Sequence, residues 1–327
     1  MASSAVQIDN RGTRGHAWAL VRRLRDGDEL AHILTLTVAS LILLITVLLV
    51  FELYRSSALS REKFGWGFFY STAWDPVAGE FGALPFIYGT VVTSIVALVI
   101  AVPLGVAAAI FLSELAPPKI SDALTFLVEL LAAVPSVIYG LLAIFVLVPL
   151  LRETLQPTLK STFGFLPFFQ GPVLGVGLLA AGLILAIMIL PFIVSISREA
   201  LLAVPREQRE AALAIGATRW EATWQVVVPF ARLGIAGSVF LALARALGET
   251  MAVTMVIGNN PKIGASLFDA GYSIAAVIAN EFTEATDDLH LSALIELGLV
   301  LFLLTIVING LARVLILATT PGGSSQP

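Results

Sequence analysis

The sequence predicts an all-helical protein that crosses a membrane six times. Of its 327 residues, 58% are hydrophobic and 13% are charged, and this charged share is about half that of a soluble domain. Apolar runs of transmembrane length recur along the chain. The basic residues also divide unequally between the two sides that these runs define. Together these three observations predict a polytopic membrane protein rather than a soluble domain with one anchor.

Six apolar segments approach or exceed the roughly 20 residues that a helix needs to cross a bilayer. We place them at residues 33–51 and at about residues 87–112, 123–151, 172–196, 235–257 and 289–317. The third segment contains Pro135 and Pro149. We therefore expect this span to be kinked or to end early.

The positions of lysine and arginine predict that both termini are cytoplasmic. With that orientation, twelve of the 19 basic residues lie inside and six lie outside, while Arg245 falls within a span. Cytoplasmic loops carry such an excess of positive charge. We therefore expect a multi-pass protein of the bacterial cell membrane (the inner or plasma membrane), in contact with the lipid bilayer.

The same pattern predicts the domain layout. Residues 1–32 form a cytoplasmic segment, either a short interfacial helix or a disordered basic leader. Residues 33–86 hold the first span and an external loop, and residues 87–318 form a core of five spans with an inner loop at 198–232. The polar residues 319–327 form a disordered tail.

Composition argues against metal-dependent and thiol chemistry. The chain has no cysteine and only three histidines, which are widely separated in the sequence. Thiolate ligands and cysteine nucleophiles are therefore absent, and a histidine metal site is disfavoured. We expect no cofactor, no catalytic residue and no nucleic-acid partner.

Two charged residues interrupt the fifth apolar segment, in "FLALARALGETMAVTMVIG". Arg245 and Glu249 are four residues apart there, and a charge near the bilayer centre costs roughly 3 kcal/mol on insertion scales. They could neutralise each other along the helix, although such pairs contribute only about 0.2–0.5 kcal/mol on exposed helices. Alternatively, the planar guanidinium of Arg245 contacts an oxyanion on a translocation pathway.

The inner loop predicts a helix–turn–helix. Pro205 suits the first turn of a helix, and Gly216 is a natural stop after "REQREAALAI". A second helix, "TRWEATWQVVV", leads to Pro229. Small Ala211 and Ala212 would expose a surface of low relief that enters a groove on another protein. An ordinary amphipathic connector is the alternative.

The stretch "EAALAIGATRWEATWQVVVP" resembles the EAA loop of ABC-importer permeases. Glu210, Ala211, Ala212, Gly216 and Pro229 fall on that motif, whereas valine precedes Pro229 where many members have leucine. The resemblance implies that the loop, through its glutamate, alanines and glycine, couples the chain to a cytoplasmic ATPase. The segment "GNNPKIG" lacks the spacing and hydroxyl residue of a phosphate-binding loop, so ATP hydrolysis belongs to another polypeptide.

Within those importers, "ARALGE", "ETMAVTMVIGN" and "VELLAAVPSVIYGL" resemble the phosphate permeases of the PstC type. The resemblance implies the six-helix architecture of ABC type I importer permeases and a phosphate pathway shared with a homologous PstA-type permease. It also implies a PstB-type ATPase dimer inside and a PstS-type phosphate-binding protein outside. A sulfate or molybdate permease is one alternative. A proton-coupled secondary transporter with Glu249 as proton carrier is another.

The role of Glu249 stays open among these interpretations. Glu249 could hold Arg245 in position and lower the affinity of Arg245 for a passing anion. Alternatively, Glu249 could accept a hydrogen bond from protonated phosphate. Both hypotheses predict that phosphate transport depends on Arg245.

Overall fold

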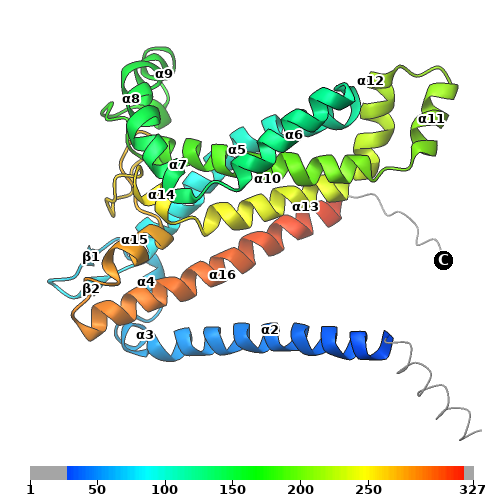
Figure 1. The fold of residues 1–327 in the computed structure, drawn as a ribbon. Helices are drawn as coiled ribbons and strands as arrows, with labels where there is room; N and C mark the ends of the chain where they lie inside the picture. Colours follow the sequence, from blue (N-terminus) through cyan, green and yellow to red (C-terminus); the bar gives the residue numbers. More distant parts are fainter. Residues whose placement is uncertain (1–27, 320–327) are drawn as a thin grey trace, which may run out of the picture. The chain divides into compact units, whose positions relative to one another are not determined.

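Residues 28–319 are described by a computed structural model, in which the chain divides into two units, residues 1–55 and 56–327 (Figure 1). Most of helix α2 (Asp28–Ser56) lies in the first unit, and apolar residues extend around it, as expected of a helix surrounded by lipid. The interfacial helix predicted within residues 1–32 and the predicted tail fall almost wholly outside the described residues.

Helices dominate the second unit, which contains one small antiparallel ribbon in addition. The ribbon pairs β1 (Trp74–Asp75) with β2 (Glu80–Phe81). The helices are α3 (Ala58–Phe64), α4 (Gly67–Tyr70), α5 (Leu84–Ile110), α6 (Pro118–Ala132), α7 (Ser136–Leu142), α8 (Val148–Leu150), α9 (Gln156–Phe163), α10 (Leu178–Leu202), α11 (Arg206–Ala214), α12 (Arg219–Ala222), α13 (Val228–Leu247), α14 (Met251–Thr254), α15 (Ile274–Glu281) and α16 (Asp288–Thr319). Short π turns are η1 (Phe111–Leu115), η2 (Ala143–Leu147), η3 (Leu151–Leu155) and η5 (Thr223–Val227), and η4 (Pro167–Phe169) is a 3₁₀ turn.

Six helical runs in the described residues are long and apolar enough to cross a membrane, which agrees with the predicted number. They are Ala31–Ser56, Leu84–Leu115, Ser136–Phe163, Leu178–Leu202, Arg219–Leu247 and Asp288–Val314. The bounds of the third, fourth and fifth spans differ from the prediction, and the fourth begins and ends later than expected. The third span begins after Pro135, because the preceding residues form the separate helix α6, and the fifth begins and ends earlier than expected.

Each π turn in the described chain ends two residues before a proline. These prolines are Pro117, Pro149, Pro157 and Pro229. A proline inside a helix lacks the N–H that would bond to the carbonyl four residues earlier, and its ring clashes with that carbonyl. A π turn widens the helix at that point. The helical runs can therefore continue through Pro149, Pro157 and Pro229, although the sequence suggested a kink or an early end at Pro149 and a helix boundary at Pro229.

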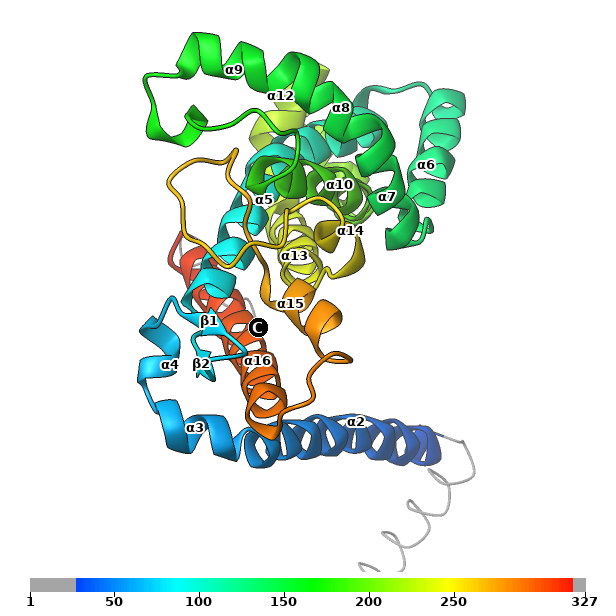
Figure 2. The same cartoon turned by 90° about the vertical axis from the view of Figure 1, so that its left-hand side faces the viewer.

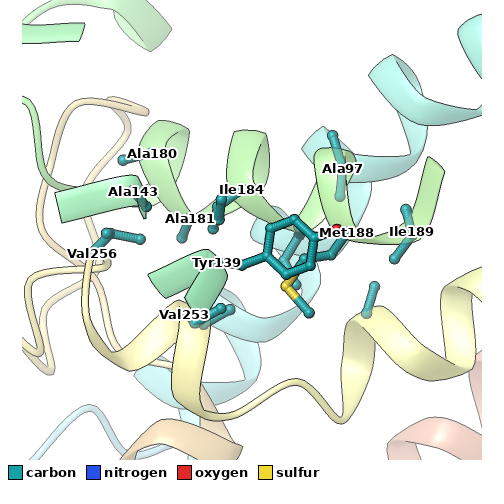
Figure 3. Close-up of a cluster of buried hydrophobic side chains, with 14 of the residues drawn as sticks. Ala97, Tyr139, Ala143, Ala180, Ala181, Ile184, Met188, Ile189, Val253 and Val256 are labelled. Carbon is teal, nitrogen blue, oxygen red and sulfur yellow. The ribbon is translucent and has the colours of Figure 1, made fainter. Parts of the chain in front are cut away.

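Helix α10 lies at the centre of the second unit and packs along α5 and α13 (Figures 1 and 3). Small residues bring α10 and α5 close together. A Cβ on Gly182 would lie 2.4 Å from the Val96 side chain, and one on Gly105 would lie 2.7 Å from that of Ile193. Figure 3 shows Ile184 of α10 among buried side chains of neighbouring helices. The two helices therefore pack closely at this crossing.

Irregular chain, the ribbon and α15 gather at one end of the long helices, and α11 and α12 lie at the other end (Figures 1 and 2). At the first end, the indole N–H of Trp74 donates to Glu281 Oε2 at 2.9 Å, and His290 Nε2 lies 3.1 Å from the same oxygen. The His290 ring stacks on Phe81 at 5.2 Å. These contacts fasten the ribbon to α15 and α16.

Replacing Gly89 by alanine is expected to destabilise this end of the protein. A Cβ at Gly89 would lie 2.2 Å from the backbone oxygen of Tyr272, so α5 would have to move away from the chain that leads into α15. Such overpacking costs about 1–3 kcal/mol. Thermal denaturation of the purified protein, followed by size-exclusion chromatography, should show a lower midpoint for Gly89→Ala.

Gly310→Ala is the matched control for this measurement. Gly310 lies within α16, where an added Cβ meets no atom within 4 Å. Its midpoint should equal or exceed that of the wild type, because alanine favours a helix more than glycine does. An unchanged midpoint for Gly89→Ala as well would show that the two segments are not in firm contact.

Candidate functional site

The two charges of the fifth apolar segment lie at a break between helices. Helix α13 ends at Leu247, and α14 begins only at Met251. The predicted continuous span over residues 235–257 is therefore wrong. Gly248 lies at the break, and glycine is a poor helix former. Its N–H still donates to the carbonyl of Ala244 at 3.3 Å.

Arg245 occupies the last turn of α13, where the partial negative charge of the helix end favours a cation. Its guanidinium carbon lies 4.6 Å from the ring centroid of Phe192 in α10, in a cation–π contact. Its Nε is buried and has no hydrogen-bond partner within residues 28–319. The protein thus holds a flat cation in place and leaves part of its hydrogen-bonding capacity unused.

Glu249 follows the break and is half-buried. Across the described chain, its carboxylate forms no ion pair with Arg245, so the i,i+4 pairing is not found here. The physical reason is the helix end between the two residues, because the i,i+4 geometry requires an uninterrupted helix. Mutual neutralisation therefore does not account for the presence of these two charges.

The chain beyond α14 holds the break in place by capping α10. The carbonyls of Val256, Leu267 and Asp269 accept hydrogen bonds of 2.7 to 3.1 Å from the backbone N–H groups of residues 177–179. The first N–H groups of a helix have no partner within that helix. The irregular chain thus satisfies its own carbonyls and the first N–H groups of α10 with protein partners.

At the opposite end of the second unit, α11 and α12 form the predicted helix–turn–helix. Pro205 precedes α11, and Gly216 follows it with φ of +94°. The N–H of Ala217 bonds to the carbonyl of Ala212 at 3.2 Å, and the N–H of Gly216 bonds to that of Leu213 at 3.0 Å. These two bonds define a Schellman motif, in which a left-handed residue ends the helix.

Helix α12 begins with a capping box and continues into the membrane span. Thr218 Oγ1 accepts from the N–H of Glu221 at 3.3 Å, and the Glu221 carboxylate accepts from the N–H of Thr218 at 2.8 Å. The helical run then extends from Arg219 to Leu247, a length of roughly 40 Å at 1.5 Å per residue. The predicted separate helix ending near Pro229 is wrong. The loop and Arg245 instead lie at opposite ends of one helical run.

The four residues of the predicted coupling surface differ in exposure. Glu210, Ala211 and Gly216 are exposed, but Ala212 is only 6% exposed. The expectation that both alanines form the surface is therefore wrong for Ala212, which lies one helical step further round and is buried. Ile215, which the sequence did not single out, is 87% exposed.

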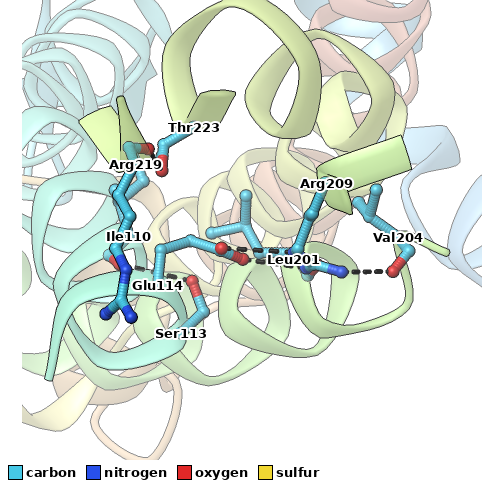
Figure 4. Close-up of polar contacts among 8 residues, drawn as sticks. All are labelled: Ile110, Ser113, Glu114, Leu201, Val204, Arg209, Arg219 and Thr223. Atoms are coloured by element: carbon cyan, nitrogen blue, oxygen red, sulfur yellow. Dashed lines mark hydrogen bonds and ion pairs between the residues drawn. The ribbon is translucent and has the colours of Figure 1, made fainter. Parts of the chain in front are cut away.

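An arginine that the sequence did not single out anchors this loop (Figure 4). Arg209 of α11 donates to both carboxylate oxygens of Glu114, at 2.8 and 3.2 Å. It also donates to the carbonyls of Leu201, at 2.7 Å, and Val204. Glu114 lies in η1, at the end of the second span. The two charged residues are 95 positions apart, so no spacing rule could have paired them.

Within residues 28–319, no group of three or more histidine, aspartate or glutamate side chains is arranged to hold a metal ion. The structure thus offers a half-buried arginine at a helix break and an exposed helical loop, joined by one helical run. This arrangement suits the passage of an anion and the docking of a partner protein.

Comparison with known proteins agrees with this arrangement. Residues 101–319 match the family described as binding-protein-dependent transport system inner membrane component. The phosphate transport system permease protein PstC of Mesorhizobium japonicum is 48% identical over 96% of this chain and 97% of its own. PstC of Haemophilus influenzae is 47% identical over 85% of this chain and 89% of its own.

A solved structure supports the same fold. A chain of the MetNI methionine ABC transporter, 20% identical, covers 73% of this chain and 95% of its own length with a TM-score of 0.50. At that identity the likeness concerns the fold alone. The chain therefore belongs to the binding-protein-dependent transport system inner membrane components, as a multi-pass, non-catalytic permease subunit.

Proposed function

We propose that the chain is the PstC-type permease of an ATP-driven phosphate importer. It forms the translocation pathway with a homologous permease of the PstA type. A PstB-type ATPase dimer docks on the inside, and a PstS-type phosphate-binding protein delivers substrate on the outside. The observation that carries the proposal is the half-buried Arg245 at a helix break, whose buried Nε has no hydrogen-bond partner and which forms no ion pair with a carboxylate in the described chain.

Two observations favour phosphate as the substrate: the chemistry of this arginine and the names of the relatives of the chain. A guanidinium presents a rigid set of donors that matches the oxygens of a tetrahedral anion. The cation–π contact with Phe192 orients the guanidinium, and because the ring is uncharged, the guanidinium is not neutralised. Relatives that are 44–48% identical over most of the chain are named phosphate permeases, which favours phosphate over sulfate or molybdate.

The exposed residues of the α11–α12 loop support the docking of the ATPase. Glu210, Ala211, Ile215 and the turn at Gly216 lie at the end of the second unit opposite the ribbon (Figure 1). With the predicted orientation, this end is cytoplasmic and both termini are on the same side. A movement of the loop would reach the helix break through the run from Arg219 to Leu247.

Glu249 has a distinct role in this proposal. Its half-buried carboxylate follows the break and is not joined to Arg245. We propose that it repels the anion as the anion leaves Arg245, so that phosphate passes without being trapped. The structural support is its position next to, but not paired with, the cation.

Transport by the reconstituted complex tests the proposed function. The chain, the second permease and the ATPase are placed in liposomes with the binding protein, and uptake of radioactive phosphate is measured. We expect uptake to require ATP, to persist when a protonophore collapses the proton gradient, and to resist excess sulfate or molybdate. If sulfate or molybdate competed with phosphate, that anion would be assigned as the substrate instead. If uptake were sensitive to the protonophore and did not need ATP, the chain would not belong to an ATP-driven importer.

A further inference from the structure

The joint between α11 and the membrane helices depends on a small number of side chains. A buried apolar cluster unites the ends of α5 and α10 with η5 and the start of α13. No residue of α11 belongs to that cluster, and the buried residue of α11 is the small Ala212. A methyl group provides little contact area. Helix α11 also packs against η5 and α12, but Arg209 provides its ion pair to the end of the second span and its hydrogen bonds at the end of α10.

Arg209 and Glu114 form a compact, shielded contact. Their side chains are 22% and 11% exposed, and the arginine binds both carboxylate oxygens. Bidentate geometry of this kind is strong and directional. The same guanidinium binds the carbonyls of Leu201 and Val204, which lie at and beyond the end of α10. One side chain of α11 thus contacts the ends of two membrane spans (Figure 4).

Open space adjoins this contact. Two hollows, of about 390 and 250 Å³, are each lined in part by Glu114 and Arg209. The backbone connections of α11 are Pro205 at one end and the left-handed Gly216 at the other. Among the ion pairs within residues 28–319, Arg209–Glu114 is the one that joins this loop to another span.

We propose that the Arg209–Glu114 pair is a strut that converts movement of the docked α11 into movement of the second and fourth spans. The inference rests on the proposed function, because it assumes that the ATPase moves α11. Without the strut, α11 still binds the ATPase through its exposed face but turns about its two ends. ATP hydrolysis then continues while transport fails. Arg209 and Glu114 are thus positioning residues, and neither touches substrate.

The test compares ATP hydrolysis with phosphate uptake in the same liposomes. For Glu114→Gln, we expect the ATPase to co-purify normally and to hydrolyse ATP at close to the wild-type rate. Uptake should fall on the order of ten-fold, within the usual range of coupling between sites. The number of ATP molecules hydrolysed per phosphate should rise by the same factor. A merely structural role would not change this ratio.

Glu199→Gln is the matched control. It removes a carboxylate near the same end of α10, 74% exposed and 3.6 Å from Arg198, and should leave the ratio at the wild-type value. The strut is contradicted if Glu114→Gln leaves the ratio unchanged, whether both activities stay normal or fall together. Loss of the ATPase on purification would contradict it as well, since the pair would then serve docking.

A charge exchange covers the case in which a single variant does not fold. The double variant Glu114→Arg with Arg209→Glu restores opposite charges but not the bonds to the α10 carbonyls. It should recover part of the assembly and uptake lost in Glu114→Arg alone, and no recovery would overturn the strut. Failure of the proposed function is seen separately, because the wild-type complex would then lack the ATPase or the phosphate uptake.

Discussion

Arg245→Gln is expected to abolish phosphate uptake while the complex still assembles. Glutamine is polar and smaller than arginine, so it can occupy the half-buried position beside Phe192. It lacks the charge that attracts an oxyanion and the fork of donors that binds it. We expect uptake to fall by at least about 100-fold, which corresponds to about 2.7 kcal/mol. The measurement is phosphate uptake at matched membrane levels of the complex.

Two further variants show whether the arginine itself is required. Arg245→Lys keeps a charge but loses the planar fork and its stacking, so uptake should lie between those of the wild type and Arg245→Gln. Arg232→Gln removes an exposed arginine from the same helix and should transport normally. Normal uptake by Arg245→Gln would remove Arg245 from the mechanism.

The number of spans could be predicted from the sequence because length and hydropathy are local properties. The breaks within the spans could not be predicted, because a proline can either end a helix or be accommodated within it. After Pro135 a new helix begins, whereas Pro149 and Pro229 continue a helical run behind π turns. Which outcome occurs depends on the packing around each proline. That packing cannot be inferred from the pattern of apolar and polar residues.

The parts of the candidate site that could be predicted are those marked by residue type or by motif spacing. A charge in an apolar segment identifies Arg245 by itself, and the motif spacing identifies Gly216. The sequence could not show that the helix ends between Arg245 and Glu249, because their spacing also suits a continuous helix. It could not show the Arg209–Glu114 contact, since tertiary packing brings those residues together across 95 positions.

Gly216→Asp is expected to remove the bound ATPase and, with it, phosphate uptake. Gly216 has φ of +94°, a conformation that costs other residues about 1–3 kcal/mol. Aspartate also adds a negative charge next to the C-terminus of α11, where the helix dipole disfavours it. The Schellman motif should open and displace the exposed face of α11. We expect at least about ten-fold less ATPase to co-purify, consistent with a loss of about 1.4 kcal/mol.

Gly216→Ala separates the two causes of this loss. Open space surrounds an added Cβ at this position, so alanine introduces backbone strain without a clash or a charge. Its loss of ATPase should be smaller than that of aspartate but measurable. Gly67→Ala, at an exposed glycine without positive φ, should bind the ATPase normally. If Gly216→Asp retained both ATPase and uptake, the left-handed turn would not be required for docking, and coupling would have to enter the membrane helices elsewhere.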